Sequence, residues 1–222
     1  DTGTISRPLL SRVTGFQVYD NDTIAYLGWR ENQQRVAGIW QRGAQQPTVL
    51  ASIPESNKQE LRISVSRYFH KDTVVVSVGP QMTIYRGALP SSNDGLAAFM
   101  QTARSFTLHR PVTNLQFNQS GRFIIAEDKK GFISYDLELH QSSQVVTKQT
   151  DQTMRWLDEY HVWDISESGQ MIMQEFDGLN SHRLMPVTAG FDVLLTQDGR
   201  YIYGFISGSD GTLTLQRLSL VL

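Results

Sequence analysis

The side chains that most often carry out chemistry in proteins are sparse in this sequence and lie far apart. Cysteine is absent, which excludes disulfides, thiolate metal sites and a cysteine nucleophile. No two histidines have the three-to-five-residue spacing that places metal ligands on one element. The histidines are His70, His109, His140, His161 and His182. We therefore expect neither a metal nor a cofactor.

Glycine and acidic motifs are equally uninformative about catalysis. Phosphate-binding glycine loops must lead into a helix, whereas Gly204, Gly208 and Gly211 stand in a predicted hairpin. Ser207-Gly208-Ser209 lacks the flanking pattern of a serine-hydrolase elbow. Asp20-Asn21-Asp22 begins like a calcium loop but lacks its glycine and glutamate, so a solvated turn is the better interpretation.

The size and the net charge of the chain further limit the classes of protein to which it can belong. The chain has 222 residues, enough for one large or two small domains, with 20 Lys+Arg against 22 Asp+Glu. A net charge of −2 disfavours general nucleic-acid binding. No apolar run approaches the roughly 18 to 20 residues of a membrane helix, so we expect no membrane insertion of this domain. The sequence begins with Asp1 and not with methionine. We therefore expect the chain to be a processed product or an excised segment, and any signal or membrane anchor that preceded it is not visible.

Short runs rich in β-branched and aromatic residues recur along the chain, for example TIAYLGW, TVVVSV, RFIIAE and RYIYGF, and turn residues separate them. Only residues 91–104 favour a helix or long loop. The segment FNQSGRFII (117–125) matches LTQDGRYIY (195–203), 78 positions later. Weaker copies indicate units of about 40 to 50 residues, the size of one four-stranded propeller blade.

This periodicity predicts an all-β fold, a single domain over residues 1–222 that forms a five-bladed β-propeller. A six-stranded barrel or a sandwich is the structural alternative. The fifth unit has only three predicted strands, and we expect an N-terminal strand, residues 4–11, to supply the fourth and close the ring without a free edge. The predicted blades span residues 11–53, 60–110, 111–150, 151–188 and 189–222.

NQSGRFIIA and TQDGRYIYG resemble the repeats of WD-like and TolB-type β-propellers, in which a turn of the form S/D-G-R/K joins an apolar strand to an aromatic one. The resemblance covers nearly the whole chain and implies the propeller fold, but it implies no particular activity. The sequence departs from true WD repeats because no unit has the Gly-His dipeptide.

Alignment of the first strand of each unit separates two sets of side chains. One register is mostly apolar and should pack between blades; it includes Phe16 and Val18. The alternate register should line the central channel, where its polar groups could hydrogen-bond a carboxylate, phosphate or sugar. The alternative, which the general polarity of propeller channels favours, is that they only solvate channel water. These candidates are Gln17, Arg67, Asn114, Gln116, Arg155 and Asp192.

The four tryptophans could stack on sugars or fill the space between blades. Trp156 and Trp163 favour core packing, whereas Trp29 and Trp40 stand at predicted strand ends and are candidates for exposed aromatic contacts.

We therefore predict a non-catalytic binding module that recognises a protein or a glycan, in an extracytoplasmic or cell-surface bacterial protein; a cytoplasmic location stays open. The alternative is a glycoside hydrolase or lyase of the five-bladed type acting near Asp192. Glycoside cleavage needs two carboxylates, and the predicted channel register supplies only that one. A purely architectural spacer is a third hypothesis.

Overall fold

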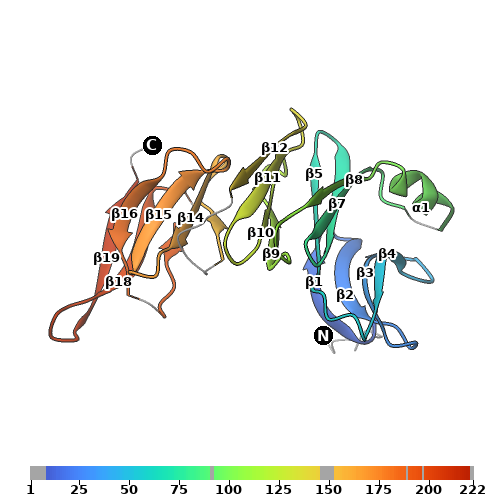
Figure 1. Cartoon of the computed structure of the whole chain (residues 1–222), viewed down its shortest axis with the longest axis horizontal. Coiled ribbons are helices and arrows are strands. Elements are labelled where there is room, and N and C mark those ends of the chain that lie inside the picture. The colour runs from blue at the N-terminus through green and yellow to red at the C-terminus, as the bar shows by residue number, and fades with distance from the viewer. Residues whose placement is uncertain (1–8, 91–92, 146–152, 189, 197, 221–222) are drawn as a thin grey trace, which may run out of the picture. The chain divides into compact units, whose positions relative to one another are not determined.

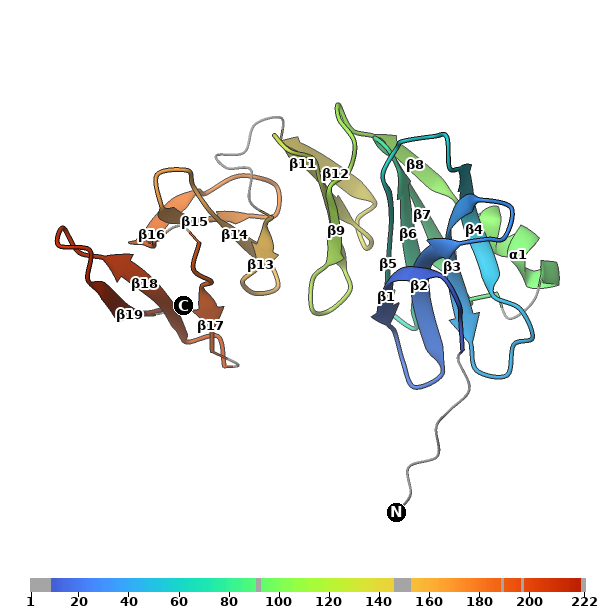
Figure 2. The same ribbon diagram turned by 90° about the horizontal axis from the view of Figure 1, so that it is seen from below.

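The computed structural model describes residues 9–90, 93–145, 153–188, 190–196 and 198–220, and these fold almost entirely as antiparallel β-sheet. They form five separate sheets (Figures 1 and 2). The predicted all-β class is confirmed. The chain divides into two compact units, residues 1–112 with two of the sheets and residues 113–222 with three.

In both sheets of the first unit the strand order follows the chain. The first sheet contains β1 (Val13–Val18), β2 (Thr23–Trp29), β3 (Gln34–Gln41) and β4 (Thr48–Pro54). The second contains β5 (Leu61–Tyr68), β6 (Lys71–Val78), β7 (Gln81–Gly87) and β8 (Arg104–Thr107). The helix α1 (Asn93–Met100) lies between β7 and β8, inside the segment predicted to be helix or loop.

The two sheets of the first unit pack face to face, with β2 and β3 against β5 (Figure 2). Ala25 and Ala37 are fully buried at this contact, and their small side chains let the sheets approach. Ile39, Val65 and Val74 fill the remaining space. The strand β6 is buried on both faces of its sheet, which is the environment in which a run of β-branched residues forms a strand.

The second unit consists of three antiparallel sheets, and in each of them the strand order again follows the chain. The third sheet contains β9 (Asn114–Phe117), β10 (Phe123–Glu127), β11 (Phe132–Asp136) and β12 (Gln141–Val145). The fourth contains β13 (Arg155–Trp156), β14 (His161–Ile165), β15 (Gln170–Glu175) and β16 (His182–Pro186). The fifth contains β17 (Leu194–Leu195), β18 (Tyr201–Ser207) and β19 (Leu213–Ser219).

Aromatic and aliphatic side chains join these sheets. The ring of Phe123 lies 4.3 Å from that of Phe176 and 6.4 Å from that of Trp156, between centroids. Between the fourth and fifth sheets, Met171 and Ile202 are fully buried. Trp156 therefore packs between sheets, as the sequence favours.

The two matched sequence segments adopt the same turn. In the first, the backbone N–H of Asn118 donates to the carbonyl of Phe123, whose own N–H donates to Asn118 Oδ1 at 3.0 Å. In the second, Thr196 N–H donates to the carbonyl of Tyr201, and Tyr201 N–H donates to Thr196 Oγ1 at 3.0 Å. The sequence repeat is therefore also a repeat of local hydrogen bonding.

The strand expected over residues 4–11 is not formed in the part that the structure describes. Residues 9–11 form no strand, and residues 4–8 lie outside the described residues. The fifth sheet has three strands. Ring closure by this strand, the blade count and the single domain stay predictions.

Asp136 fixes the end of β11. It accepts hydrogen bonds from Arg122 Nη2 at 2.7 Å and from the backbone N–H of Glu138 and Leu139. Burial raises the pKa of this carboxyl, but the hydrogen bonds from Arg122 and the two backbone N–H groups outweigh it, and the pKa lies below its ordinary value. The ionised form is thus the one that the fold stabilises.

Replacing Asp136 by Asn should lower the free energy of unfolding at pH 7 by about 1 to 3 kcal/mol, because Arg122 loses its buried ionic partner. A lowered folded-state pKa gives stability that is present above the ordinary pKa and is lost as the pH falls through the folded-state value. The difference between wild type and variant should therefore shrink below about pH 4. Urea unfolding of both proteins at pH 7 and pH 3 measures this difference in unfolding free energy. A difference that is independent of pH would contradict a stabilising role of the ionised Asp136 carboxylate.

Gly199 supplies the left-handed residue of the second matched turn, with φ of 70°. A Cβ at this position would meet no atom within 4 Å, so a substitution tests the backbone alone. Gly199→Ala should cost about 1 to 2 kcal/mol of unfolding free energy. Gly199→Asn should cost less, because Asn tolerates this conformation. Equal losses in the two variants, measured by urea unfolding, would refute a backbone cause.

Candidate functional site

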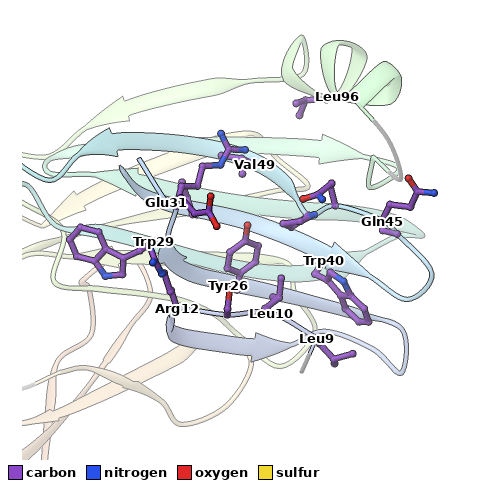
Figure 3. A pocket seen from close by; sticks show the side chains of 16 residues that line it. Leu9, Leu10, Arg12, Tyr26, Trp29, Glu31, Trp40, Gln45, Val49 and Leu96 are labelled. Carbon is purple, nitrogen blue, oxygen red and sulfur yellow. The ribbon is translucent and has the colours of Figure 1, made fainter. Parts of the chain in front are cut away.

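A cleft of about 750 Å³ opens on the first sheet (Figure 3). Neighbouring residues of a strand point to opposite faces of the sheet. Ala37 and Ile39 pack in the core shared with the second sheet, whereas the alternating Val36 and Trp40 line the cleft. The cleft therefore lies on the face of the first sheet that is turned away from the second sheet.

The floor of this cleft is apolar and tightly built. Val36 is 2% exposed and Tyr26 is 5% exposed. Gly38 lies directly across from Tyr26 in the ladder. A Cβ on Gly38 would come within 2.5 Å of the carbonyl oxygen of Thr48 and 2.9 Å of the Tyr26 ring, so glycine is required where this ring and the Thr48 backbone approach β3. Burial raises the pKa of Tyr26, with Arg30 opposing it, so its hydroxyl stays a neutral donor.

Two tryptophans form the walls. Trp29 ends β2 and Trp40 lies in β3, and both side chains are half-buried at the cleft (Figure 3). The two residues that the sequence singled out as exposed aromatic contacts thus both line this cleft, at opposite ends of it in Figure 3. Around them stands a polar rim of Arg12, Arg30, Glu31, Gln45 and Gln46.

The third side of the cleft is the segment before β1. Arg12 has φ of 56°, and its carbonyl accepts a hydrogen bond from Trp29 N–H at 3.0 Å. A Cβ on Gly28 would lie 2.9 Å from that carbonyl, so glycine is required for the approach. This bend directs Leu9 and Leu10 to the cleft, beside Trp40 in Figure 3.

Two of the polar strand residues lie in the first unit and are engaged in contacts between its sheets. The Gln17 amide donates to the carbonyl of Val65 at 2.9 Å and accepts from Val65 N–H at 3.0 Å, so β1 is clamped to the backbone of β5. Arg67 Nε donates to Asp72 Oδ1 at 2.7 Å, and the Arg67 guanidinium lies over the Tyr19 ring.

Gln116 repeats this clamp in the second unit. Its Nε2 donates to the carbonyl of Met154 at 2.7 Å. The N–H of Met154 lies 3.1 Å from both carboxylate oxygens of the buried Glu127. Asn114 is half-buried and pairs with Glu127 in the β9–β10 ladder. The peptide of Met154 is thus held on both sides by the third sheet.

Arg155 and Asp192 also lie in the second unit, where their side chains meet at 3.0 Å and are 51% and 75% exposed. The Arg155 guanidinium lies over the ring of Trp163. An exposed pair of this kind contributes little to stability. Since the six polar candidates are divided between two units, their common channel stays a prediction.

The packing of Phe16 and Val18 between blades stays a prediction. Within the first unit they do not pack on the second sheet, and the two residues are 70% and 62% exposed on β1. They alternate with Gln17, which faces the second sheet, and therefore point away from it.

Asp72 is a contact centre that the sequence does not reveal. It accepts hydrogen bonds from the Tyr19 hydroxyl, from Arg67 and from the backbone N–H of Leu89. Burial and the bond to Asp72 raise the pKa of Tyr19. No local motif marks this position, because its partners are up to 53 positions away in the chain.

Metal sites and membrane helices are not found in the part of the chain that the structure describes. The described residues contain no group of three or more His, Asp or Glu side chains able to hold a metal ion. Within the same residues, no helix is long and apolar enough to cross a bilayer.

No protein-family model matches the chain, and no curated protein does. Solved structures do match. The C-terminal WD40 domain of Sif2 is 14% identical with a TM-score of 0.50, over 89% of this chain and 54% of that one. An uncharacterized protein of Listeria monocytogenes, lmo1340, is 12% identical with a TM-score of 0.51, over 94% of this chain and 64% of that one.

The chain thus spans about half the length of the matched WD40 chain. At these identities the likeness concerns the fold alone, and with the five separate sheets it supports a fold of the β-propeller class.

The two glutamine clamps should matter for stability. We expect Gln17→Ala and Gln116→Ala each to lower the free energy of unfolding by about 1 to 3 kcal/mol, because backbone groups of the next sheet lose their partners. Gln45→Ala, on the exposed rim, is the matched control and should change it by less than about 0.5 kcal/mol. Urea unfolding checks the series; clamp variants as stable as the control would show that the contacts contribute nothing.

Proposed function

We propose that this protein is a non-catalytic binding module built on a propeller of five blades, and that it recognises a protein or a glycan at the cleft on its first sheet. The observation that carries this proposal is the position of Trp29 and Trp40 on one cleft. Rigid aromatic rings are effective anchors because they bury much area and lose little conformational freedom.

The rest of the cleft suits recognition better than catalysis. Its floor of Tyr26 and Val36 is apolar and buried. Its charges, Arg12, Arg30 and Glu31, stand at the rim, where they can orient a ligand. No observation on the described residues favours the alternative at Asp192, whose carboxylate is paired with Arg155.

The test uses two probes, an array of immobilised oligosaccharides and an array of peptides of about a dozen residues. We expect wild-type protein to bind members of one array, and Trp40→Ala to lose at least about tenfold in affinity, the usual effect of removing an aromatic anchor. Trp29→Ala should weaken the binding of the same ligands.

Phe69→Ala is the control for loss of an exposed aromatic residue, because Phe69 is 72% exposed and does not line the cleft. It should bind as the wild type does. Equal binding by the Trp40 and Phe69 variants, with unchanged melting temperatures, would remove the cleft from the proposed function.

A further inference from the structure

The floor of the cleft on the first sheet contains a polar group without a partner. Tyr26 is 5% exposed, and its hydroxyl forms no hydrogen bond with any residue that the structure describes. A hydroxyl that is withdrawn from water and has no partner is costly for the folded protein. Figure 3 shows this hydroxyl directed into the cleft, between Trp29 and Trp40. The cleft therefore lacks a hydrogen-bond acceptor at this point, and a ligand can supply it.

The charge around this hydroxyl favours an anionic acceptor. Burial raises the pKa of Tyr26, and among the described residues Arg30 is the charged group that opposes this rise. A positive charge thus acts at a hydroxyl that stays a neutral donor. The charged residues that line the cleft are Arg12, Arg30 and Glu31, and none of these side chains forms a hydrogen bond or ion pair with a described residue. The cleft therefore has a net positive charge and two guanidinium groups that can bind a carboxylate.

The positions of the two tryptophans require an elongated ligand. In the β2–β3 ladder Trp40 lies opposite Ile24, and Trp29 follows five positions later on β2. At about 3.3 Å per residue, their backbone positions are about 17 Å apart along the sheet. Tyr26 lies between them. An extended peptide of about five residues has the length to contact both rings and the hydroxyl.

Access to the Tyr26 hydroxyl favours a peptide over a glycan. Tyr26 and Val36, on the same face of the sheet, are 5% and 2% exposed, so the opening that reaches the hydroxyl is narrow. The carboxylate of a glutamate is carried on a thin, flexible stem that can enter such an opening. An acidic sugar carries its carboxylate directly on a ring. The tryptophan rings on which that sugar would stack lie at the two ends of the cleft, away from the hydroxyl.

We propose that this cleft binds an extended acidic segment of a partner protein. A glutamate carboxylate of that segment accepts hydrogen bonds from the Tyr26 hydroxyl and the Arg30 guanidinium, and apolar side chains on either side contact Trp29 and Trp40. The spacing along β2 places these apolar residues two to three positions from the glutamate. The inference rests on the proposed function, because it uses the same cleft and the same aromatic anchors and names the class of ligand.

The probes are peptides of about eight residues, each with one glutamate and with a leucine two or three positions to either side. Paired peptides carry glutamine or alanine in place of the glutamate. The wild type should bind the glutamate peptides, and the alanine peptides at least about tenfold more weakly. The glutamine peptides should fall between them, because a charged acceptor makes the stronger hydrogen bond. Affinity for the glutamate peptides should also decrease as salt rises from about 0.05 M to about 0.5 M.

Tyr26→Phe removes the hydroxyl and keeps the ring. It should bind the glutamate peptides at least about tenfold more weakly and the alanine peptides as the wild type does. Its melting temperature should not fall, because the hydroxyl has no partner among the described residues. Arg30→Gln should weaken the binding of the glutamate peptides, whereas Glu31→Gln should strengthen it by removing a like charge. Arg183→Gln is the matched control, an exposed arginine of β16 outside the cleft, and should bind as the wild type does.

A Tyr26→Phe variant that loses no more affinity for glutamate peptides than for alanine peptides, or that melts at a lower temperature, would overturn the proposal. Binding of oligosaccharides alone, weakened by Trp40→Ala, would also overturn it but leave the proposed function standing with a glycan as the ligand. Peptide binding that appears only after removal of residues 1–8 would assign the cleft to the chain's own N-terminal segment, against the proposal. Binding of neither peptides nor oligosaccharides would overturn both.

Discussion

The stacking of one sheet on the next is the interaction on which this molecule depends. Strands such as β6 have apolar side chains on both faces, so a single sheet cannot bury its own surface. Stacking alone leaves the register between sheets undefined, because apolar contact has no direction. Gln17 and Gln116 supply that direction, because each amide bonds to backbone of the next sheet in its unit: Gln17 to Val65 within β5, and Gln116 to Met154 just before β13.

The same requirement explains the cleft. A sheet face that meets no other sheet must be covered by something else or stay open. On the first sheet this face carries Tyr26 and Trp40, and the bend at Arg12 brings Leu9 and Leu10 beside them. The face is covered only in part, since Phe16 remains 70% exposed. A binding surface made of aromatic side chains on a rigid sheet needs no separate loop to build it.

Much of the architecture could be predicted because it is local. The matched segments around Gly121 and Gly199 identify the turns, and the β-branched runs identify the strands. Side-chain roles are harder to predict, because alternation in a strand gives two faces without saying what each one meets. The sequence therefore predicts Gln17 in a channel and Phe16 in a packing layer, and it does not show that within the first unit Gln17 binds the backbone of the second sheet and Phe16 is exposed. Asp72 is not visible in the sequence at all, because its partner Tyr19 lies far away in the chain.

The protection of sheet edges connects these observations. A strand selected to be outermost shows it in its composition, as the proline of β4 and the charges of β16 do. Leu213 and Leu215 of β19 are exposed, and an exposed apolar side chain forgoes the stabilisation that burial would give. Leu213 and Leu215 lie at the end of β19 nearest the β18–β19 turn, whereas Leu218, at the other end of the ladder, is half-buried in the core with the fourth sheet. β19 thus carries apolar side chains on both faces, with Leu218 on the face that packs against the fourth sheet and Leu213 and Leu215 on the other.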